Sequence, residues 1–464
     1  MNYLTLVNKQ NKIKESYFKN MILSTYKNVF DENISIEEKA KEEFCKLKEY
    51  LETKNIFIGI RDSYRDINTQ QEIYDYYLKK EGKTYCDNYV AIPYYSEHHT
   101  GLAIDITIKY NGKFLEDDEE LICLDDEKYD EIHRNLSKFG FILRYPKNKE
   151  NITGYKYEPW HIRYVGKIPA KIIYENNLTL EEYLNEFGGV LIINKEKDMT
   201  SFDVVREVSK VLGIKKIGHT GTLDPLAEGV LVLTIGKYTK LGEDLTSLDK
   251  EYIAKVKQGI LTDTLDITGQ VLEENNKRIT NIKEVLKSFK KTYMQEVPKY
   301  SAVKVNGKKL YEYARKGEEV ILPKKEVTIK EIKLLEKDEN NFTFKTTVSK
   351  GTYIRSLIRD IGESSNTLMT MTSLTRTRQG KFKIEDSYKL DDIKNGNFKI
   401  LKIEDILDYK IIDIDEKTLK KIENGVIIDN IYDIENKVIF THNGKKIAIY
   451  TVDNKKLRMH LKLS

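Results

Sequence analysis

The sequence has 464 residues, more than one compact core usually holds, so we expect two or three domains. Hydrophobic residues make up 40% of the chain and charged residues 33%, which excludes a wholly disordered chain and a fibrous repeat. The 78 basic and 74 acidic residues leave a net charge of +4, and a value so close to neutral does not identify a nucleic-acid-binding protein on its own.

The cysteines and the first residues of the chain bear on its compartment. Cys45, Cys86 and Cys123 are an odd number spread over a long stretch, which is no disulfide framework and predicts a reducing compartment. The beginning, MNYLTLVNKQNKIKESYF, lacks the basic and then apolar pattern of a secretory signal. No stretch approaches the roughly 18 apolar residues of a membrane-spanning helix. These features together predict a cytoplasmic protein without a membrane segment.

The first region mixes helical and strand-like periodicity. The spacing of its apolar residues predicts a helix over 36–51, and short apolar runs predict strands over 56–60 and 103–108. In the second of these strands the isoleucines alternate with Asp105. This acid therefore lies opposite a buried apolar row and must face water or a partner.

A helix and a pair of glycines mark the end of this region. We expect a closing helix over 177–187, with Thr179 as its N-cap and Glu182 three residues later in a capping-box arrangement. Two glycines, at 188 and 189, end this helix, and a new strand over 190–193 begins at once. We therefore place a domain boundary near residue 188.

Strands and helices alternate beyond this boundary to about residue 400, and the last segment is rich in short β-runs. Asn424-Gly425 and Asn443-Gly444 in that segment both predict hairpin turns. No internal repeat relates the two halves of the chain, which indicates a fusion of unrelated units rather than a duplication.

The histidines of the first region suggest a metal site. Four of the seven histidines of the chain lie there, at 98, 99, 133 and 161. His98 is followed by Gly101 and then by the predicted strand that contains Asp105. Glu158 precedes His161 by three residues. Two imidazoles and one carboxylate make a catalytic zinc set, and Glu158 is then a spare carboxylate for the proton of the bound water. Taken singly, adjacent histidines are often solvated loop residues, and a Glu-x-x-His pair occurs by chance.

Together these segments resemble a known family. The strings SEHHTGLAIDI and GFILRYPKNKENITGYKYEPWHIRYVG look like those of the VanY-type D-alanyl-D-alanine carboxypeptidases, zinc peptidases that trim peptidoglycan stem peptides, and the resemblance covers roughly residues 3–187. It implies that His98, Asp105 and His161 are the zinc ligands and that Glu158 is the general base and acid. It leaves His99 as a loop residue, and a packed or surface position is expected for His133.

The same resemblance implies substrate-binding residues. Arg65 would stabilise the developing oxyanion, Gln70 would help to hold the terminal carboxylate of the substrate, and Ser96 would also contact the substrate. This chain departs from the family where Asp62-Ser63 replaces Ser-Gly and where Tyr94 replaces a glycine. These departures concern the fit of the substrate more than the metal. Members of the family normally act outside the membrane and carry an export signal, which conflicts with the beginning of this chain.

A second motif, GHTGTLDPLAEGVL, surrounds a single aspartate with three glycines. Pro225 biases Asp224 away from helical backbone angles, so its carboxylate should be presented on an extended or turn segment. A Leu-Asp-Pro turn is the simpler interpretation of the dipeptide alone. The full string is similar to the signature of the TruB family of tRNA pseudouridine synthases, which isomerise a uridine in the T-arm of tRNA. Further blocks match in order over about residues 188–400: LDKEY, GILTDTLD, PKYSAVKVNG and SKGTYIRSL.

This resemblance implies the roles of five residues. Asp224 is the essential acid, and Arg355 pairs with it and keeps it ionised and oriented. Tyr252 stacks on the uracil, Tyr353 packs beneath the base and serves in proton transfer, and His219 holds the displaced nucleotide or its neighbours. The isomerisation requires no metal or redox cofactor.

Some features of this half remain open to a second interpretation. Asp263 and Asp266, in the Thr-Asp-Thr-x-Asp block, could bind a metal, but a turn with internal hydrogen bonds is the preferred interpretation. Lysine pairs such as Lys308-Lys309 are solvated faces or phosphate contacts. The family's Lys-Pro-x-Gly-x-Thr-Ser start appears here as KEKDMTS, which lacks the proline and the glycine. The KIENGVI segment of the tail resembles the PUA-like domain that grips the tRNA stem.

The sequence therefore predicts an α+β protein of several domains. These are a small α+β zinc-peptidase domain over 1–187, a mixed α/β synthase domain with a largely antiparallel central sheet over 188–404, and a small PUA-like β-domain over 405–464. The predicted function is a tRNA pseudouridine synthase acting on U55, fused to a Zn²⁺-dependent carboxypeptidase-like domain that trims peptidoglycan-derived peptides ending in D-Ala-D-Ala. Two alternatives stay open: an inactive or binding-only peptidase half, and a synthase half that acts as a tRNA-folding chaperone.

Overall fold

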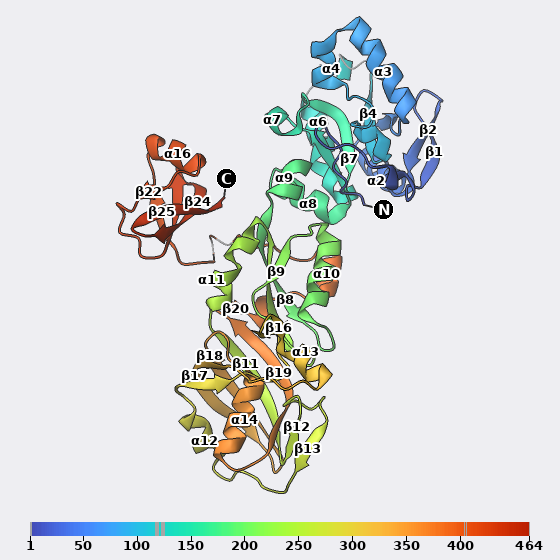
Figure 1. The fold of residues 1–464 in the computed structure, drawn as a ribbon. Coiled ribbons are helices and arrows are strands. Elements are labelled where there is room, and N and C mark those ends of the chain that lie inside the picture. Colours follow the sequence, from blue (N-terminus) through green and yellow to red (C-terminus); the bar gives the residue numbers. More distant parts are fainter. Residues whose placement is uncertain (1, 117–119, 122–125, 403, 405, 464) are drawn as a thin grey trace. The chain divides into compact units, whose positions relative to one another are not determined.

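The computed structural model describes residues 2–116, 120–121, 126–402, 404 and 406–463 (Figure 1). The chain divides into a first unit, Met1–Phe187 with Val211–Gly213, and a second unit, Gly188–Lys210 with Ile214–Ser464. The division into three domains stays a prediction. Cys45 and Cys86 are free thiols, while Cys123 lies outside the described residues.

The first unit is built around an antiparallel sheet with the strand order β3-β4-β7-β6. The strand predicted over 103–108 is confirmed and runs two residues further, and the one predicted over 56–60 begins and ends two residues later. A separate hairpin pairs β1 with β2. The strands of this unit are β1 (Leu23–Lys27), β2 (Asn33–Glu37), β3 (Ile58–Asp62), β4 (Ala103–Tyr110), β5 (Lys113–Phe114), β6 (Phe141–Tyr145) and β7 (Glu158–Tyr164).

The helix predicted over 36–51 is α2, and it starts two residues later because Glu37 caps it. The Glu37 carboxylate accepts a hydrogen bond from the backbone N–H of Ala40, 2.9 Å away. The helices and 3₁₀ turns of the first unit are α1 (Glu15–Phe18), α2 (Glu38–Glu52), α3 (Ile67–Lys80), α4 (Lys83–Tyr89), η1 (Glu97–Thr100), α6 (Asp126–Leu136), η2 (Ser137–Phe139), α7 (Glu150–Thr153), α8 (Lys167–Glu175) and α9 (Leu180–Asn185).

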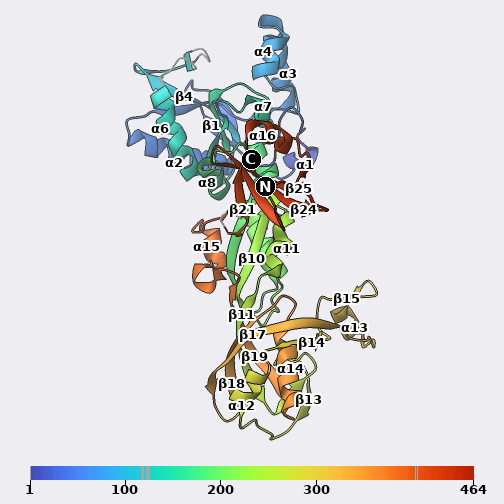
Figure 2. The same ribbon diagram turned by 90° about the vertical axis from the view of Figure 1, so that its left-hand side faces the viewer.

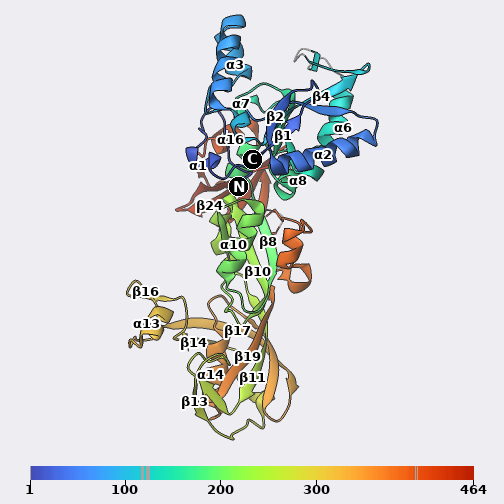
Figure 3. The same ribbon diagram turned by 90° about the vertical axis from the view of Figure 1, so that its right-hand side faces the viewer.

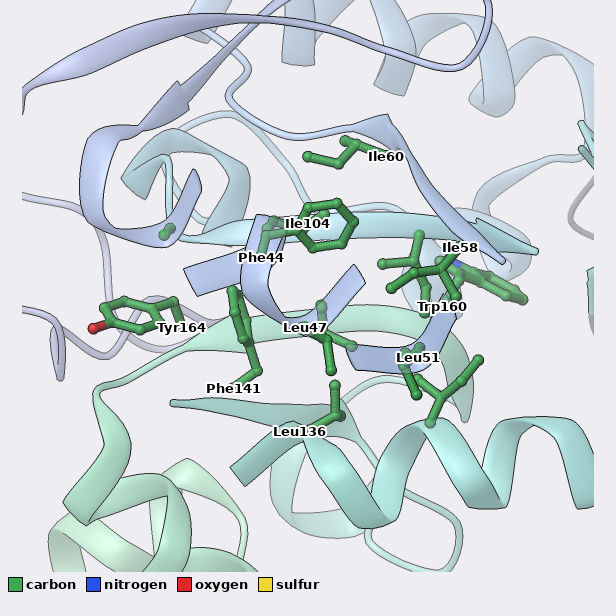
Figure 4. Packing of buried hydrophobic residues seen from close by; sticks show 14 of the residues in the cluster. Phe44, Leu47, Leu51, Ile58, Ile60, Ile104, Leu136, Phe141, Trp160 and Tyr164 are labelled. Carbon is green, nitrogen blue, oxygen red and sulfur yellow. The ribbon is translucent and has the colours of Figure 1, made fainter. Parts of the chain in front are cut away.

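Helix α2 packs its apolar face against the sheet of the first unit. Its residues Phe44, Leu47 and Leu51 belong to one buried cluster with Ile104 of β4 and Trp160 of β7 (Figure 4). Burial of a large apolar side chain contributes about 1.5–3 kcal/mol relative to exposure. This packing fixes β4 and β7, the strands whose opposite faces carry polar side chains.

The closing helix of the first unit is α9, and its predicted capping box is confirmed. The Thr179 side chain accepts from the backbone of Glu182 at 3.2 Å, and the Glu182 carboxylate accepts from the backbone of Thr179 at 2.8 Å. The strand β8 begins at Gly188, two residues before the predicted start.

The main sheet of the second unit has the strand order β14-β17-β18-β11-β19-β10-β8. Strand β10 pairs in parallel with β19, while the other neighbours along this order pair antiparallel, so the sheet is largely antiparallel as predicted. Its strands are β8 (Gly188–Lys195), β10 (Glu228–Gly236), β11 (Lys250–Gln258), β14 (Thr292–Glu296), β17 (Lys324–Lys337), β18 (Asn341–Val348) and β19 (Met369–Gln379), with β9 (Ile217–His219) on β10 and β20 (Phe382–Lys383) on β19.

Smaller elements surround this sheet. Figures 2 and 3 show the hairpin β15–β16 and helix α13 projecting from its side. These elements are α10 (Ser201–Leu212), η3 (Lys237–Leu241), α11 (Gly242–Ser247), β12 (Ile260–Thr262), β13 (Val271–Glu274), α12 (Ile282–Ser288), β15 (Lys304–Val305), β16 (Lys308–Lys309), α13 (Leu310–Lys316), α14 (Ile354–Ser364), η4 (Ile384–Asp386) and α15 (Leu390–Lys394). Among the helices in the described ranges, none combines the length and the apolar character needed to cross a bilayer.

The tail folds as a sheet of order β21-β23-β24-β25-β22, with α16 (Glu416–Glu423) before β22. The hairpin predicted at Asn443-Gly444 is confirmed between β23 and β24. The hairpin predicted at Asn424-Gly425 is wrong, because these residues end α16, with Gly425 in the left-handed region at φ 68°. The strands are β21 (Lys410–Asp413), β22 (Ile428–Asp429), β23 (Lys437–His442), β24 (Lys445–Asp453) and β25 (Lys456–Lys462).

We expect Gly229→Ala to destabilise the second unit by more than about 2 kcal/mol, because the position needs a positive φ and leaves no space for a Cβ atom. Gly229 has φ 102°, and a Cβ there would lie 2.3 Å from the carbonyl oxygen of Arg376 on the parallel neighbour β19. Differential scanning calorimetry should show a lower unfolding temperature for this unit. Gly242→Ala is the matched control, since its Cβ would meet nothing within 4 Å and its φ is −57°. Equal unfolding temperatures for both variants would contradict the prediction.

Candidate active sites

Three predicted ligand residues of the first unit lie together. One donor atom from each of His98, Asp105 and His161 lies within 4.8 Å of the others, and all three residues are buried. His98 comes from η1, Asp105 from β4 and His161 from β7. Asp105 and His161 are direct cross-strand partners, so the pairing of β4 with β7 itself sets their separation.

The ring orientations leave one nitrogen of each histidine facing the carboxylate. His98 Nδ1 contacts the backbone carbonyl of Ser63, which places its proton on that side, and His98 Nε2 lies 3.3 Å from Asp105 Oδ2. His161 Nδ1 lies 3.1 Å from Asp105 Oδ1. His98 Nε2 and His161 Nδ1 therefore converge with the carboxylate, as the donor atoms of one cation site must.

The electrostatics of the cluster keep the carboxylate ionised. Burial raises the pKa of Asp105, but the adjacent His98 and His161 outweigh this and hold the pKa well below its usual range. Burial lowers the pKa of His161, but the carboxylates of Asp105 and Glu97 outweigh it and raise the pKa to about 9. An ionised, buried carboxylate between two histidine rings suits a divalent cation with N and O ligands.

A cavity of about 100 Å³ opens beside this cluster. Glu158, the predicted base, lines it with its Oε2 3.7 Å from His161 Nδ1, so a second carboxylate lies next to the ligand set. The predicted substrate residues Arg65, Gln70 and Ser96 line the same cavity. The remaining walls are mostly aromatic, from Tyr77, Tyr89, Tyr145, Tyr155 and Trp160.

Arg65 is held in the cavity by acidic neighbours. Its Nη2 lies 2.9 Å from Asp105 Oδ2, and its Nε lies 2.6 Å from Asp62 Oδ2. Asp62 is one of the departures from the family pattern, and here it orients the arginine. Gln70 donates to the backbone carbonyl of Ala91 at 2.7 Å, and the Ser96 hydroxyl accepts from the backbone of His98 at 3.3 Å. Ser96 thus also sets the turn that presents His98.

The other histidines of the first unit lie outside the ligand set. His99 is fully buried, and its ring joins the Arg65 carbonyl, at 2.7 Å, to the Tyr94 backbone N–H, at 3.0 Å. His133 lies on α6, and its Nε2 is 2.9 Å from the carbonyl of Pro159. Both rings support the backbone around the cluster.

In the second unit, the predicted pairing of Asp224 with Arg355 is present. Arg355 Nη2 lies 2.8 Å from Asp224 Oδ2. The Asp224 side chain is 37% exposed, whereas that of Arg355 is 5% exposed. The carboxylate therefore faces outward on its loop while a buried guanidinium holds it from behind, which fixes its orientation.

The aspartate loop is anchored from beneath by residues of three elements. The Ser201 hydroxyl accepts from the Leu223 backbone N–H at 2.9 Å. The fully buried Arg376 donates to the carbonyls of Gly221, at 2.9 Å, and Val230, at 2.6 Å. The Lys195 ammonium donates to the carbonyl of Pro225, which follows Asp224, at 3.5 Å, and to that of Met199 at 2.7 Å. Burial lowers the pKa of Lys195 to about 8, although nearby Asp224 acts in the opposite direction.

Tyr353 and Tyr252 come from different elements of the second unit, the start of α14 and strand β11. Tyr353 caps α14, and the buried amide of Gln295 binds its backbone on both sides, accepting from its N–H at 2.8 Å and donating to its carbonyl at 3.2 Å. Burial raises the pKa of the Tyr353 hydroxyl. Tyr252 lies on β11 and is 7% exposed, opposite Thr346 on one side and Arg376 on the other.

His219 ends β9, where it pairs with Leu233 of β10. Its Nδ1 is buried without a hydrogen-bond partner in the described part of the chain. Burial lowers its pKa, and Arg376 adds to the effect, so the ring is neutral at pH 7. A neutral ring with an unpaired nitrogen can accept or donate a hydrogen bond to a bound nucleotide.

Asp266 joins this site as a residue whose role the sequence interpretation did not identify. One carboxylate oxygen binds Thr264 Oγ1 and the Thr268 backbone N–H, each at 3.0 Å, which is the predicted turn. The other oxygen lies 4.0 Å from Arg355 Nη1. Arg355 also donates to the carbonyls of Thr264 and Tyr300 at 2.9 Å each. Its guanidinium thus stands between the buried Asp266 and the half-exposed Asp224.

We expect Asp266→Asn to slow the reaction at Asp224 by about 10–100-fold, equivalent to about 1.4–2.7 kcal/mol, because an amide removes the charge that holds Arg355. Asparagine can keep the hydrogen bonds of the turn. Single-turnover kinetics measure the effect. Asp263→Asn is the control, since that carboxylate binds Tyr300 and the Gln270 backbone, at 3.1 and 2.8 Å. Equal rates for the two variants would contradict a role for Asp266.

Two family models match the chain. The TruB family pseudouridylate synthase (N terminal domain) matches residues 209–354, and D-alanyl-D-alanine carboxypeptidase matches residues 33–167. The tRNA pseudouridine synthase B of Caldanaerobacter subterraneus subsp. tengcongensis is 41% identical over 276 residues, which are 58% of this chain and 97% of that protein. The tRNA pseudouridine synthase B of Fusobacterium nucleatum is 49% identical over 199 residues, 42% of this chain and 69% of that protein.

One similar solved structure is a mutant of the vancomycin resistance D,D-pentapeptidase VanY from a VanB-type resistance cassette, in complex with Zn(II). It is 32% identical, with a TM-score of 0.35, and the match covers 40% of this chain and 100% of that one.

Proposed function

This chain belongs to the TruB family of tRNA pseudouridine synthases, and from that premise we propose that it isomerises U55 in the T-arm of tRNA with Asp224 as its essential acid. The observation that carries the assignment is the outward-facing carboxylate of Asp224, held at 2.8 Å by the buried Arg355. Such a carboxylate is oriented and accessible to a nucleotide that has left its stack.

The reaction breaks the bond from ribose to a ring nitrogen and forms a bond to a ring carbon, so the detached base must be held in place. Tyr252 would stack on the uracil face, a contact of about 1–3 kcal/mol in other proteins. Tyr353 would pack beneath the base, and its hydroxyl would serve in transferring the proton that the carbon loses. His219 would hold the displaced nucleotide or its neighbours. None of these steps requires a metal or redox cofactor.

We propose that tRNA is bound through phosphate contacts that lie away from this site. Lysine pairs such as Lys308-Lys309 on β16 supply charge that positions an RNA without reading its bases. The tail sheet, which we propose to be PUA-like, would grip the tRNA stem. A tRNA substrate implies that the protein works in the cytoplasm, where tRNA matures. Cell fractionation followed by detection of the full-length chain would test this localisation.

A tritium-release assay tests the synthase function. The purified chain is incubated with a tRNA transcript carrying tritium at C5 of its uridines, because pseudouridine formation replaces the hydrogen at that carbon. We expect release of one tritium per tRNA, and none from a transcript in which cytidine replaces U55. Release from both transcripts would contradict the proposed position.

The N-terminal domain is D-alanyl-D-alanine carboxypeptidase-like, and we propose that it binds zinc and removes the terminal D-alanine of a peptidoglycan-derived peptide ending in D-Ala-D-Ala. His98, Asp105 and His161 would hold the ion. When bound, zinc polarises a carbonyl and lowers the pKa of water. The supporting observation is the convergence of two imidazole nitrogens and one ionised carboxylate beside a cavity that Glu158 also lines.

The residues around the cavity divide the remaining work. Glu158 would take a proton from the attacking water and give it to the leaving amine. Arg65 would stabilise the oxyanion, and Gln70, with Ser96, would hold the peptide end. Metal analysis of the full-length chain after zinc loading and dialysis tests the ligand set. We expect about one zinc per chain, lost in His161→Ala, and retention of zinc by that variant would contradict the ligand assignment.

A further inference from the structure

We propose that Glu97 is the positioning residue of the metal cluster: its buried carboxylate accepts the Nε2 proton of His161 and so fixes the ring with Nδ1 toward the metal. The inference rests on the proposed zinc site of the first unit. It concerns a carboxylate that is neither a ligand nor the proposed base.

Two buried polar atoms carry this inference. Among the described residues, His161 Nε2 and Glu97 Oε2 have no hydrogen-bond partner, and they face each other at 3.7 Å. A buried donor left unpaired costs about 1–3 kcal/mol, so such atoms usually find a partner. When Nδ1 of a neutral imidazole binds a metal, its proton must reside on Nε2. Metal binding at Nδ1 therefore makes His161 Nε2 a hydrogen-bond donor that faces Glu97 Oε2, which can accept the bond.

The other histidine of the cluster already shows the arrangement. His98 presents Nε2 to Asp105, and its Nδ1 contacts the backbone carbonyl of Ser63. Histidine ligands almost always donate their second N–H to a carbonyl, carboxylate or water, which fixes the ring and its tautomer. Glu97 stands in the corresponding position for His161.

Glu97 is itself held rigidly. Its Oε1 accepts from Arg144 Nε at 2.8 Å and from Arg163 Nη1 at 2.7 Å, and none of these three side chains is exposed. Arg144 also grips Glu181 of α9, at 2.6 and 3.0 Å, and Arg163 donates to the carbonyl of Tyr3 at 3.0 Å. With one oxygen occupied by both arginines, the second oxygen is left to His161.

Substitution of Glu97 should therefore weaken zinc binding by about 10–100-fold, the usual effect of losing such a partner. In Glu97→Gln the arginines would hold the amide oxygen, so the NH₂ group would oppose the His161 N–H. In Glu97→Asp the shorter side chain would withdraw the carboxylate from the ring while keeping its charge. Glu181→Gln is the matched control, because Glu181 binds Arg144 and Asn8 rather than His161.

The experiment measures zinc affinity of the full-length chain by competition with a chromogenic chelator, and the visible absorption of the cobalt(II)-substituted protein. Near-ultraviolet circular dichroism confirms that each variant is folded, and Glu97→Asp decides the result if Glu97→Gln fails to fold. The expected result is weaker zinc binding and an altered cobalt spectrum in the Glu97 variants, with both readouts unchanged in Glu181→Gln.

Three outcomes would overturn the inference in distinguishable ways. Unchanged affinity and spectrum in a folded Glu97 variant would remove the positioning role and leave the zinc site standing. An equal loss in Glu181→Gln would assign the effect to the buried ion network as a whole. If the unaltered chain binds no more zinc than the His161→Ala variant does, both the zinc site and the inference are overturned.

Discussion

Asp224→Asn should abolish pseudouridine formation, with a rate at least about 10³-fold lower, equivalent to about 4 kcal/mol in the barrier. Asparagine has the size of aspartate, and its amide oxygen can still accept from Arg355 at the 2.8 Å position. What it lacks is the negative charge, and the reaction needs an ionised carboxylate at the sugar or the base. Tritium release under single-turnover conditions measures the change.

Two controls separate loss of chemistry from loss of structure. Binding of tRNA, measured by filter retention, should persist in Asp224→Asn because the phosphate contacts lie on other residues. Asp198→Asn tests an acid of the adjacent loop, whose backbone N–H donates to Pro225 and whose φ of 64° asparagine also adopts. It should keep the normal rate. Pseudouridine formation at a normal rate by Asp224→Asn would overturn the active-site assignment.

Local patterns allowed parts of both sites to be predicted. Strand alternation placed Asp105 opposite an apolar row, and the structure gives it the predicted partners instead of water. The capping box at Thr179 is confirmed because its hydrogen bonds span three residues. Asn424-Gly425 shows the limit of such patterns: a hairpin turn and a helix end both require a left-handed residue, and the structure places a helix end there.

Roles that depend on distant contacts could not be predicted in this way. Glu97 and Glu158 both stand close to a histidine in the sequence, yet Glu97 is bound by arginines that follow it by 47 and 66 residues. Asp266 is a turn residue, as its local sequence indicates. Its second carboxylate oxygen lies near Arg355 because the fold packs α14 beside this turn. In both residues the two carboxylate oxygens have different partners; the sequence indicates the local turn of Asp266 but none of the partners of Glu97.

Glu158→Gln should slow release of D-alanine from a stem pentapeptide by about 10²–10⁴-fold, the usual contribution of a general base and acid. Glutamine fits the same buried space but cannot take a proton from water at neutral pH. Because Glu158 is outside the cluster of His98, Asp105 and His161, zinc content should stay unchanged. The assay uses the zinc-loaded full-length chain and coupled detection of free D-alanine.

The pattern across variants distinguishes an enzyme from a binding module. His161→Ala should lose both zinc and D-alanine release, whereas Glu158→Gln should lose release alone. One departure near the cavity, Asp62, acts on its shape through Arg65 rather than on the ligands. If the unaltered chain holds zinc but releases no D-alanine, the cluster binds metal without hydrolysing this peptide, and the N-terminal domain is a module whose cavity serves a different ligand or none.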